Sequence, residues 1–97
     1  MSKIRKSARG QECQIRIPGV CNFDPATTVL CHINGAGWGR KQPDYMAAYG
    51  CSSCHDAIDG RMKTPFTKDE LKQMHLEGVL RTQAILVELG LMTYEGI

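Results

Sequence analysis

Aromatic residues and long hydrophobic runs are both scarce in this sequence. Its 97 residues include one Trp, three Tyr and two Phe. No apolar stretch reaches the roughly 18 residues that a membrane-spanning helix needs, so we expect no such helix. So few aromatic side chains are also a poor lining for a haem pocket. The basic start of the chain is followed by polar residues instead of an apolar segment, which predicts no secretory signal and a cytoplasmic protein.

Charge of one sign is not in large excess either, but its distribution is uneven. The formal net charge is +2, whereas residues 1–16 contain five basic residues and one acidic residue. A basic arm over residues 1–10 favours contact with a phosphate backbone, although a solvated, poorly ordered terminus has the same composition. We expect this arm and the loop at 35–43 to contact DNA. The residues expected to make the contacts are Lys3, Arg5, Lys6, Arg9, Arg16, Trp38, Arg40 and Lys41.

The chain is too short for a large hydrophobic core. Its composition, 42% hydrophobic and 23% charged, indicates a single globular domain over residues 1–97. Domains of this size often need a metal ion or disulfides for stability. Five cysteines in a reducing compartment favour a metal, although two disulfides fit the same count. We expect no small-molecule cofactor.

Two short strands are predicted in the first third of the chain. Residues 12–17 alternate between polar and apolar types, and residues 27–33 are rich in β-branched and apolar types. We expect these two segments to pair in antiparallel fashion across residues 18–26. Residues 44–50 show no clear pattern.

Two helices are predicted in the second half. One spans Cys51 to Asp59 and stops at Gly60. The other covers residues 67–90 and is amphipathic: Thr67 and Glu70 form a capping-box pattern, and Gly90 follows as a stop signal. Its apolar stripe should cover the small ββα unit that precedes it.

Four of the cysteines fall into two pairs with a spacing suited to zinc. Cys51 and Cys54 form a Cys-x-x-Cys pair, while Cys13 and Cys21 form a wider pair. Four thiolates from two separate segments are typical of a tetrahedral structural zinc site, whose binding energy adds to folding energy. We expect the fifth, Cys31, to be a buried thiol on the second strand. A redox pair or a haem attached at Cys-x-x-Cys-His are the alternatives.

Two histidines and the acidic residue Asp59 are further candidates for the site. His32 ends the second predicted strand, and His55 directly follows Cys54. Asp59 lies four residues after His55, so both would occupy one face of a helix and could chelate one divalent ion.

The order of these residues resembles that of the HNH nucleases, also called the ββα-metal or His-Me finger group. Zinc-containing members share a cysteine pair, a strand ending in His-Ile, a loop and Cys-x-x-Cys-His, which correspond here to residues 12–60. The chain is more closely similar to small prophage-encoded nucleases of the YbcO type, in the segments ARGQECQIRIPGVCN, CSSCHDAIDG and EGVLRTQ. This resemblance implies an α+β fold with a small ββα-metal unit, a structural zinc site and a long covering C-terminal helix.

The resemblance also implies a function: a metal-dependent DNA endonuclease of prophage origin that hydrolyses phosphodiester bonds. His32 would be the general base, and Asp44 would orient it, with Asn34 as a second candidate. His55 and Asp59 would bind a catalytic divalent metal such as Mg, Mn or Ni, which would stabilise charge on the scissile phosphate.

One position departs from the HNH pattern. HNH enzymes usually carry Asp, Glu or His directly before the base histidine, whereas this chain has Cys31. A neutral thiol is a poor ligand for a hard ion such as Mg²⁺. The main alternative function is therefore a non-catalytic, zinc-stapled module that binds nucleic acid or protein. A redox or haem protein is the third.

Overall fold

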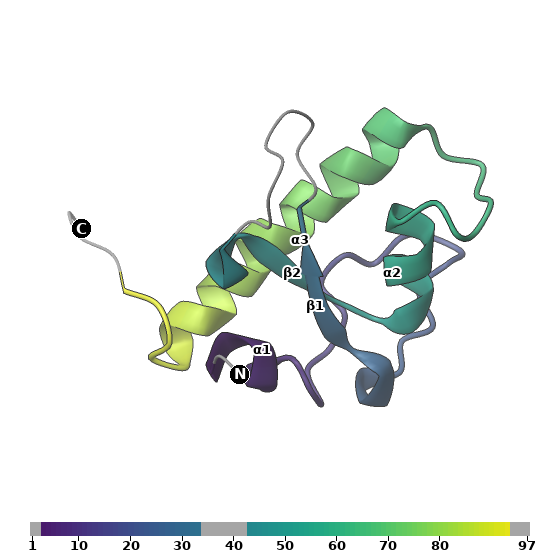
Figure 1. Cartoon of the computed structure of the whole chain (residues 1–97). Helices are drawn as coiled ribbons and strands as arrows, with labels where there is room; N and C mark the ends of the chain where they lie inside the picture. Colours follow the sequence, from purple (N-terminus) through teal and green to yellow (C-terminus); the bar gives the residue numbers. More distant parts are fainter. Residues whose placement is uncertain (1–2, 34–42, 94–97) are drawn as a thin grey trace.

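A two-stranded antiparallel sheet lies at the centre of the computed structural model, which describes residues 3–33 and 43–93 (Figure 1). Strand β1 (Val29–His32) pairs with strand β2 (Ala47–Gly50), with Leu30 opposite Tyr49 and His32 opposite Ala47. The sheet and the helices give the α+β class that the sequence predicts. Within the described residues, no helix is long and apolar enough to cross a membrane.

The predicted strand at 12–17 is wrong, and so is its pairing with the second strand. Arg16 has a left-handed backbone (φ 54°), which interrupts an extended chain. Only Gln14 bonds to the sheet backbone here, through its N–H to the Tyr49 carbonyl at 2.7 Å. The alternating pattern arises because the segment turns to bury Ile15 and Ile17. The partner of β1 is instead β2, in the stretch without a clear sequence pattern.

Helix α2 (Ser52–Ile58) begins where the sequence predicts and ends before Gly60. Cys51 is its N-cap, with Sγ accepting the Cys54 N–H at 3.4 Å. Gly60 has φ 79°, a left-handed conformation that suits glycine at a helix end. The N-terminus of α2 therefore presents two cysteine side chains together.

Helix α3 (Lys68–Glu88) confirms the predicted long C-terminal helix. Thr67 Oγ1 accepts the Glu70 N–H at 3.1 Å, and Glu70 Oε1 accepts the Thr67 N–H at 2.8 Å, which completes the capping box. The helix packs along β2, where Thr82 Oγ1 accepts the Tyr49 N–H at 2.9 Å.

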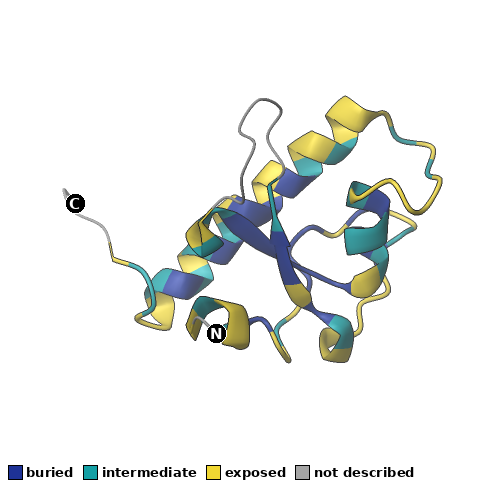
Figure 2. Ribbon diagram, in the orientation of Figure 1, coloured by how far each residue is buried: buried dark blue, intermediate teal, exposed yellow. Residues whose placement is uncertain are grey.

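Both strands and the inner part of α3 are largely buried (Figure 2), and the buried side chains form two groups. We call the first the cysteine core; it contains Cys13, Ile15, Ile17, Cys21, Cys31, Ala48, Cys51, Cys54, Ala57 and Val79. We call the second the α1 core; it contains Ala8, Leu30, Ala47, Tyr49 and Leu86. Neighbouring strand residues such as Leu30 and Cys31 enter different cores because side chains alternate along a strand.

Helix α1 (Lys3–Ser7) forms part of the predicted basic arm. Ala8 is buried beside it, and Ser7 Oγ lies 2.6 Å from Tyr49 Oη. Ser7 donates its own proton to the Ile4 carbonyl, so Tyr49 is the donor in this pair. Residues 3–8 are therefore packed against the domain.

Candidate functional site

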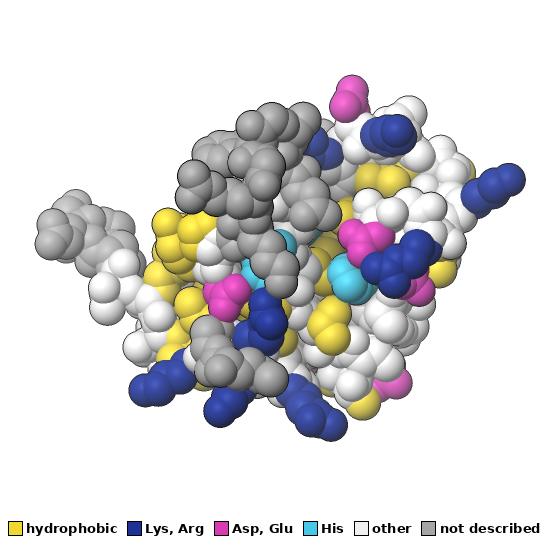
Figure 3. Space-filling view, in the orientation of Figure 1, with side chains coloured by type: hydrophobic (Ala, Val, Ile, Leu, Met, Phe, Trp, Pro, Cys, Tyr) yellow, Lys and Arg dark blue, Asp and Glu magenta, His cyan; other side chains and the backbone are white. Residues whose placement is uncertain are grey.

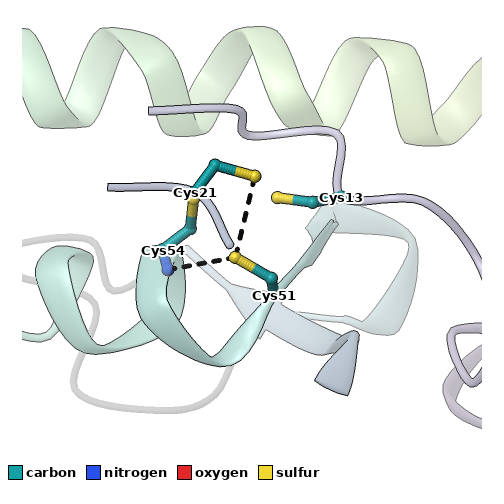
Figure 4. A group of neighbouring side chains, drawn as sticks. All are labelled: Cys13, Cys21, Cys51 and Cys54. Atoms are coloured by element: carbon teal, nitrogen blue, oxygen red, sulfur yellow. Dashed lines mark hydrogen bonds between the residues drawn. The ribbon is translucent and has the colours of Figure 1, made fainter. Parts of the chain in front are cut away.

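Four cysteine sulfurs converge beside the N-terminus of α2 (Figure 4). Cys13 and Cys21 come from the irregular segment before β1, while Cys51 and Cys54 come from the start of α2. All four Sγ atoms lie within 4.8 Å of one another, and Cys21 and Cys51 are 3.8 Å apart. A Zn–S bond of about 2.3 Å in tetrahedral geometry requires sulfurs about 3.8 Å apart. The four residues therefore fit a zinc ion, and all five cysteines are free thiols.

Backbone N–H groups surround these sulfurs. Arg16 N–H donates to Cys13 Sγ and Asn22 N–H donates to Cys51 Sγ, each at 3.5 Å. The Asn22 side chain also donates to Ser52 Oγ at 3.1 Å, which ties the segment carrying Cys21 to α2. Such outer contacts orient sulfur ligands and stabilise their thiolate form.

The cysteines ionise unequally without a metal. A hydrogen bond from Cys54 lowers the pKa of Cys13 to about 4, and donating that bond raises the pKa of Cys54. Burial raises the pKa of Cys21 to about 11. Deprotonating all four thiols in this buried group needs a compensating cation, which is what a structural zinc supplies.

The fifth cysteine is not part of this cluster. Cys31 lies on β1 and is buried, as the sequence predicts. Burial raises the pKa of its thiol to about 12. Because side chains alternate along β1, Cys31 points to the opposite face from His32. A Cβ on Gly50 would lie 2.7 Å from Cys31 Sγ, so the opposite strand needs glycine there.

His32 and Asp44 form a close pair at the end of the sheet. His32 ends β1, and Asp44 begins the 3₁₀ turn η2 (Asp44–Met46) that leads into β2. His32 Nε2 lies 2.7 Å from Asp44 Oδ1, and Arg5 Nη2 lies 4.0 Å from the same oxygen. The antiparallel pairing of β1 and β2 brings the two residues together, although twelve positions separate them in the chain.

His55 and Asp59 form a second pair on α2. His55 Nε2 lies 3.2 Å from Asp59 Oδ2, at the expected i, i+4 spacing. Arg61 Nη2 lies 2.6 Å from the same Asp59 oxygen. Figure 3 shows histidine side chains at two places on one face of the molecule, each beside an acidic side chain.

The side chains of His55 and Asp59 together offer a divalent ion one nitrogen ligand and one oxygen ligand. In the described part of the chain, the four cysteines are the only cluster of three or more metal-ligating residues. Divalent ions such as Mg²⁺ commonly use one or two protein ligands, with water and substrate phosphate completing the shell. His55 and Asp59 fit that mode of binding once Arg61 turns from Asp59 Oδ2.

His75, the third histidine of the chain, is buried on α3. Its Nε2 lies 2.9 Å from the Cys31 carbonyl oxygen, and burial lowers its pKa. The helical spacing of Leu71, His75 and Val79 is a signal that could have assigned it to the buried stripe. His75 and Asp59 also line a cavity of about 420 Å³ with Lys68 and Lys72, two cations that the sequence analysis did not select.

The predicted DNA-contacting residues lie in different surroundings. Lys3, Arg5 and Lys6 are on α1, and Arg9 follows it. Arg16 donates to the Cys13 carbonyl at 3.1 Å and to Gln14 Oε1 at 3.3 Å, so its side chain braces the turn at Cys13. The other predicted DNA-contacting residues, Trp38, Arg40 and Lys41, lie outside the described residues, as does Asn34, the second candidate to orient His32.

Comparison with known proteins assigns this small α+β domain with four clustered cysteines to a family. The model of the family described as "Putative nuclease YbcO" matches residues 2–91. The chain belongs to this family.

Relatives of similar length exist in a bacterium and in a phage. The chain is 49% identical over 96 residues to "Putative nuclease YbcO" of Escherichia coli (strain K12) and, equally, to its counterpart from Enterobacteria phage 82. Each match covers 95% of this chain and 98% of the relative. A solved structure, described as a "putative bacteriophage protein" of Escherichia coli K-12, is also 49% identical, with a TM-score of 0.77. That match covers 91% of this chain and 100% of the other.

Proposed function

We propose that this protein is a cytoplasmic, metal-dependent DNA endonuclease of prophage origin with an HNH-type mechanism. The observation that carries the proposal is the contact of His32 Nε2 with Asp44 Oδ1 at 2.7 Å. Membership of a family named as nucleases supports it. The substrate is DNA, and the bond hydrolysed is a phosphodiester.

His32 is the general base in this mechanism. An ionised carboxylate only accepts hydrogen bonds, so the contact with Asp44 requires the proton on His32 Nε2. Nδ1 is then unprotonated and can take a proton from the attacking water. Asp44 fixes this tautomer and stabilises the imidazolium that forms, and Arg5 Nη2 lies 4.0 Å from Asp44 Oδ1.

His55 and Asp59 would hold the catalytic cation. A divalent ion bound there would supply positive charge to the scissile phosphate and the leaving oxygen. Arg61, whose Nη2 lies 2.6 Å from Asp59 Oδ2, places an exposed guanidinium beside this pair, where it would contact a neighbouring phosphate. The cysteine cluster would hold a separate, structural zinc that fixes the start of α2 and so the position of His55.

A plasmid-nicking assay tests this proposal. Protein of measured zinc content is incubated with supercoiled DNA and Mg²⁺, Mn²⁺, Ni²⁺ or EDTA. We expect metal-dependent nicking that falls at least about 100-fold in His32→Ala, with zinc content and folding unchanged. Asp44→Asn should retain less activity than Lys63→Gln, a control that removes an exposed charge outside both pairs. No cleavage by folded, zinc-loaded wild-type protein with any metal would refute the enzyme.

One observation favours a second function. Cys31, at the position where HNH enzymes usually carry a metal ligand, is a buried neutral thiol on the face opposite His32. The second candidate is therefore a zinc-stapled module that binds DNA without cutting it. DNA binding that survives His32→Ala, together with absent cleavage, identifies this outcome.

A further inference from the structure

One buried side chain of α3 contacts the strand that carries the candidate base. His75 Nε2 lies 2.9 Å from the carbonyl oxygen of Cys31, and His75 is 5% exposed. A carbonyl oxygen only accepts hydrogen bonds, so the proton of this bond is on His75 Nε2. The Cys31 carbonyl and the His32 N–H belong to the same peptide group. The hydrogen bond from His75 therefore holds the peptide directly before the candidate base.

The end of β1 has little other support from the sheet. The strand is four residues long, and its partner in the two-stranded sheet is β2. Just after the strand, the Ile33 N–H donates to the Met46 carbonyl over 3.4 Å, which is long for such a bond. The bond from His75 is shorter and is shielded from water, where a hydrogen bond is stronger. His75 is therefore a main support of this end of β1.

Helix α3 is a firm base for that support. A Cβ on Gly78 would lie 3.1 Å from Ile15 Cα, so the helix backbone packs directly against the segment before β1. One turn further on, Thr82 Oγ1 accepts the Tyr49 N–H at 2.9 Å. His75 lies one turn before Gly78, so the position of its ring is fixed by the packing of the whole helix.

His75 also lies between the two candidate His–Asp pairs. It lines the cavity of about 420 Å³ together with Ile33, which follows the base, and Asp59. We call His55 and Asp59 the α2 pair. Burial is the largest cause of the lowered pKa of His75, and smaller electrostatic effects come from Asp59, His55 and His32. Members of both pairs are therefore close enough to act on this one ring.

We propose that His75 is a positioning residue that fixes the base relative to the α2 pair. By holding the Cys31 carbonyl to α3, it keeps His32 in contact with Asp44 and at a set distance from the catalytic cation. The proposal rests on the nuclease function. A displacement of about 1 Å in a reacting group can lower a rate about 100-fold, so such a support has a measurable effect. A histidine that only fills space would be replaceable without a change in rate.

Two amides of different length test whether the hydrogen bond matters. The amide N–H of His75→Gln can reach the position of Nε2, whereas that of His75→Asn is one methylene shorter and cannot reach the Cys31 carbonyl. In the nicking assay we expect kcat to fall about tenfold or more in His75→Asn, with KM within about twofold of wild type. His75→Gln should keep kcat within about threefold of wild type. Equal kcat in the two variants would overturn the proposal.

Thr82→Val is the matched structural control. It removes another buried hydrogen bond between α3 and the sheet, and Tyr49, the donor in that bond, lies opposite Leu30 instead of the base. Thr82→Val should lower the melting temperature, because it leaves a buried backbone N–H unpaired, yet keep kcat near the wild-type value. An equal fall of kcat in Thr82→Val would mean that lost stability explains the effect, and it would refute the positioning role. If the buried amide of His75→Asn prevents folding, His75→Leu takes its place with the same expected loss of kcat.

The ring of His32 gives a readout that needs no catalysis. Long-range ¹H–¹⁵N spectra of zinc-loaded protein at about pH 8, without a catalytic metal, report which ring nitrogen carries the proton. Wild type and His75→Gln should carry it on Nε2, as the contact with Asp44 requires. His75→Asn should show a mixture of both tautomers, because the contact with Asp44 is no longer held. A wild-type pattern in His75→Asn would contradict the proposal.

The two proposals fail in different ways. Nicking by the wild-type protein that is unchanged in His75→Asn leaves the nuclease standing and refutes the positioning role. No nicking by the wild-type protein refutes the enzyme. A mixture of His32 tautomers in His75→Asn would then still support the hold of His75 on the His32–Asp44 contact, and a single tautomer would refute it.

Discussion

The cysteine core and the α1 core are stabilised in different ways. The cysteine core gathers four sulfurs from an irregular segment and from the start of α2. Near it, two non-glycine residues have a left-handed backbone, Arg16 (φ 54°) and Phe23 (φ 55°). The α1 core is built from aliphatic side chains, Tyr49 and a few hydrogen bonds. A metal can hold strained irregular chain in place, whereas the α1 core depends on apolar burial and hydrogen bonds.

This difference also separates the two candidate functional pairs. His55 follows Cys54 directly, so its position depends on the cysteine cluster. His32 and Asp44 lie between the sheet and α1, where Arg5 reaches Asp44. Damage to one core should therefore affect the two pairs unequally.

Loss of the metal should have the largest effect. Structural zinc contributes on the order of 10 kcal/mol to small zinc domains, so Cys51→Ala or a strong chelator should abolish cooperative folding. Zinc analysis and circular dichroism measure this. Cys31→Ala is the matched control, because Cys31 is buried outside the cluster; it should retain one zinc per chain and a cooperative transition. A folded, cooperative Cys51→Ala protein without zinc would contradict the structural role.

Truncation in the α1 core should have a smaller effect. Leu86 is fully buried there, so Leu86→Ala should cost about 2–5 kcal/mol in the free energy of unfolding. Urea denaturation measures the loss. Zinc content should stay at one per chain, because the cluster lies in the other core. Loss of zinc from Leu86→Ala would show that the two cores are not separable.

The hydroxyl of Tyr49 on β2 forms a hydrogen bond with Ser7 of α1. Tyr49→Phe removes the donor to Ser7 Oγ, and we expect a loss of about 1 kcal/mol. Hydrogen exchange should rise in α1 more than in α2. Weaker DNA binding should accompany this change if α1 carries the phosphate contacts. Equal exchange in both helices would mean that apolar packing of Ala8 is enough to hold α1.

The smallest expected effect concerns pH. Burial lowers the pKa of His75 in the folded state, so below about pH 6.5 the unfolded chain binds a proton that the folded chain excludes. Stability must then fall as pH falls through that range. His75→Gln should reduce this dependence between pH 7.5 and 5.5, as measured by thermal unfolding of the zinc-loaded proteins. An identical pH profile in both proteins would contradict burial of a neutral His75.

Several elements could be read directly from local patterns. The capping box at Thr67 and Glu70, and the stop at Gly90, located α3, because these signals act within a few residues of chain. Gly60 did the same for the end of α2. The four cysteines were also selected correctly as neighbours, since their chemistry leaves few other uses for them.

Other features depended on contacts between distant residues. Residues 12–17 have the alternation of a strand, yet the need to bring Cys13 beside Cys21 turns the chain at Arg16. Residues 47–50 show no clear strand pattern, and they form β2 because Tyr49 packs in the α1 core and Gly50 fits the tight space beside Cys31 and Ile15. Local propensity was overruled in both cases by tertiary packing.

The sequence by itself determined helices α2 and α3, the cysteine cluster and the His55–Asp59 spacing, because caps, metal chemistry and the helical repeat are local properties. Only the tertiary structure decided the partner of β1, the contact of His32 with Asp44 and the contact of Tyr49 with Ser7 on α1. Those three features join segments that are far apart in the chain. Their free energy comes from burying surfaces against one another, and no local pattern records which surfaces will meet.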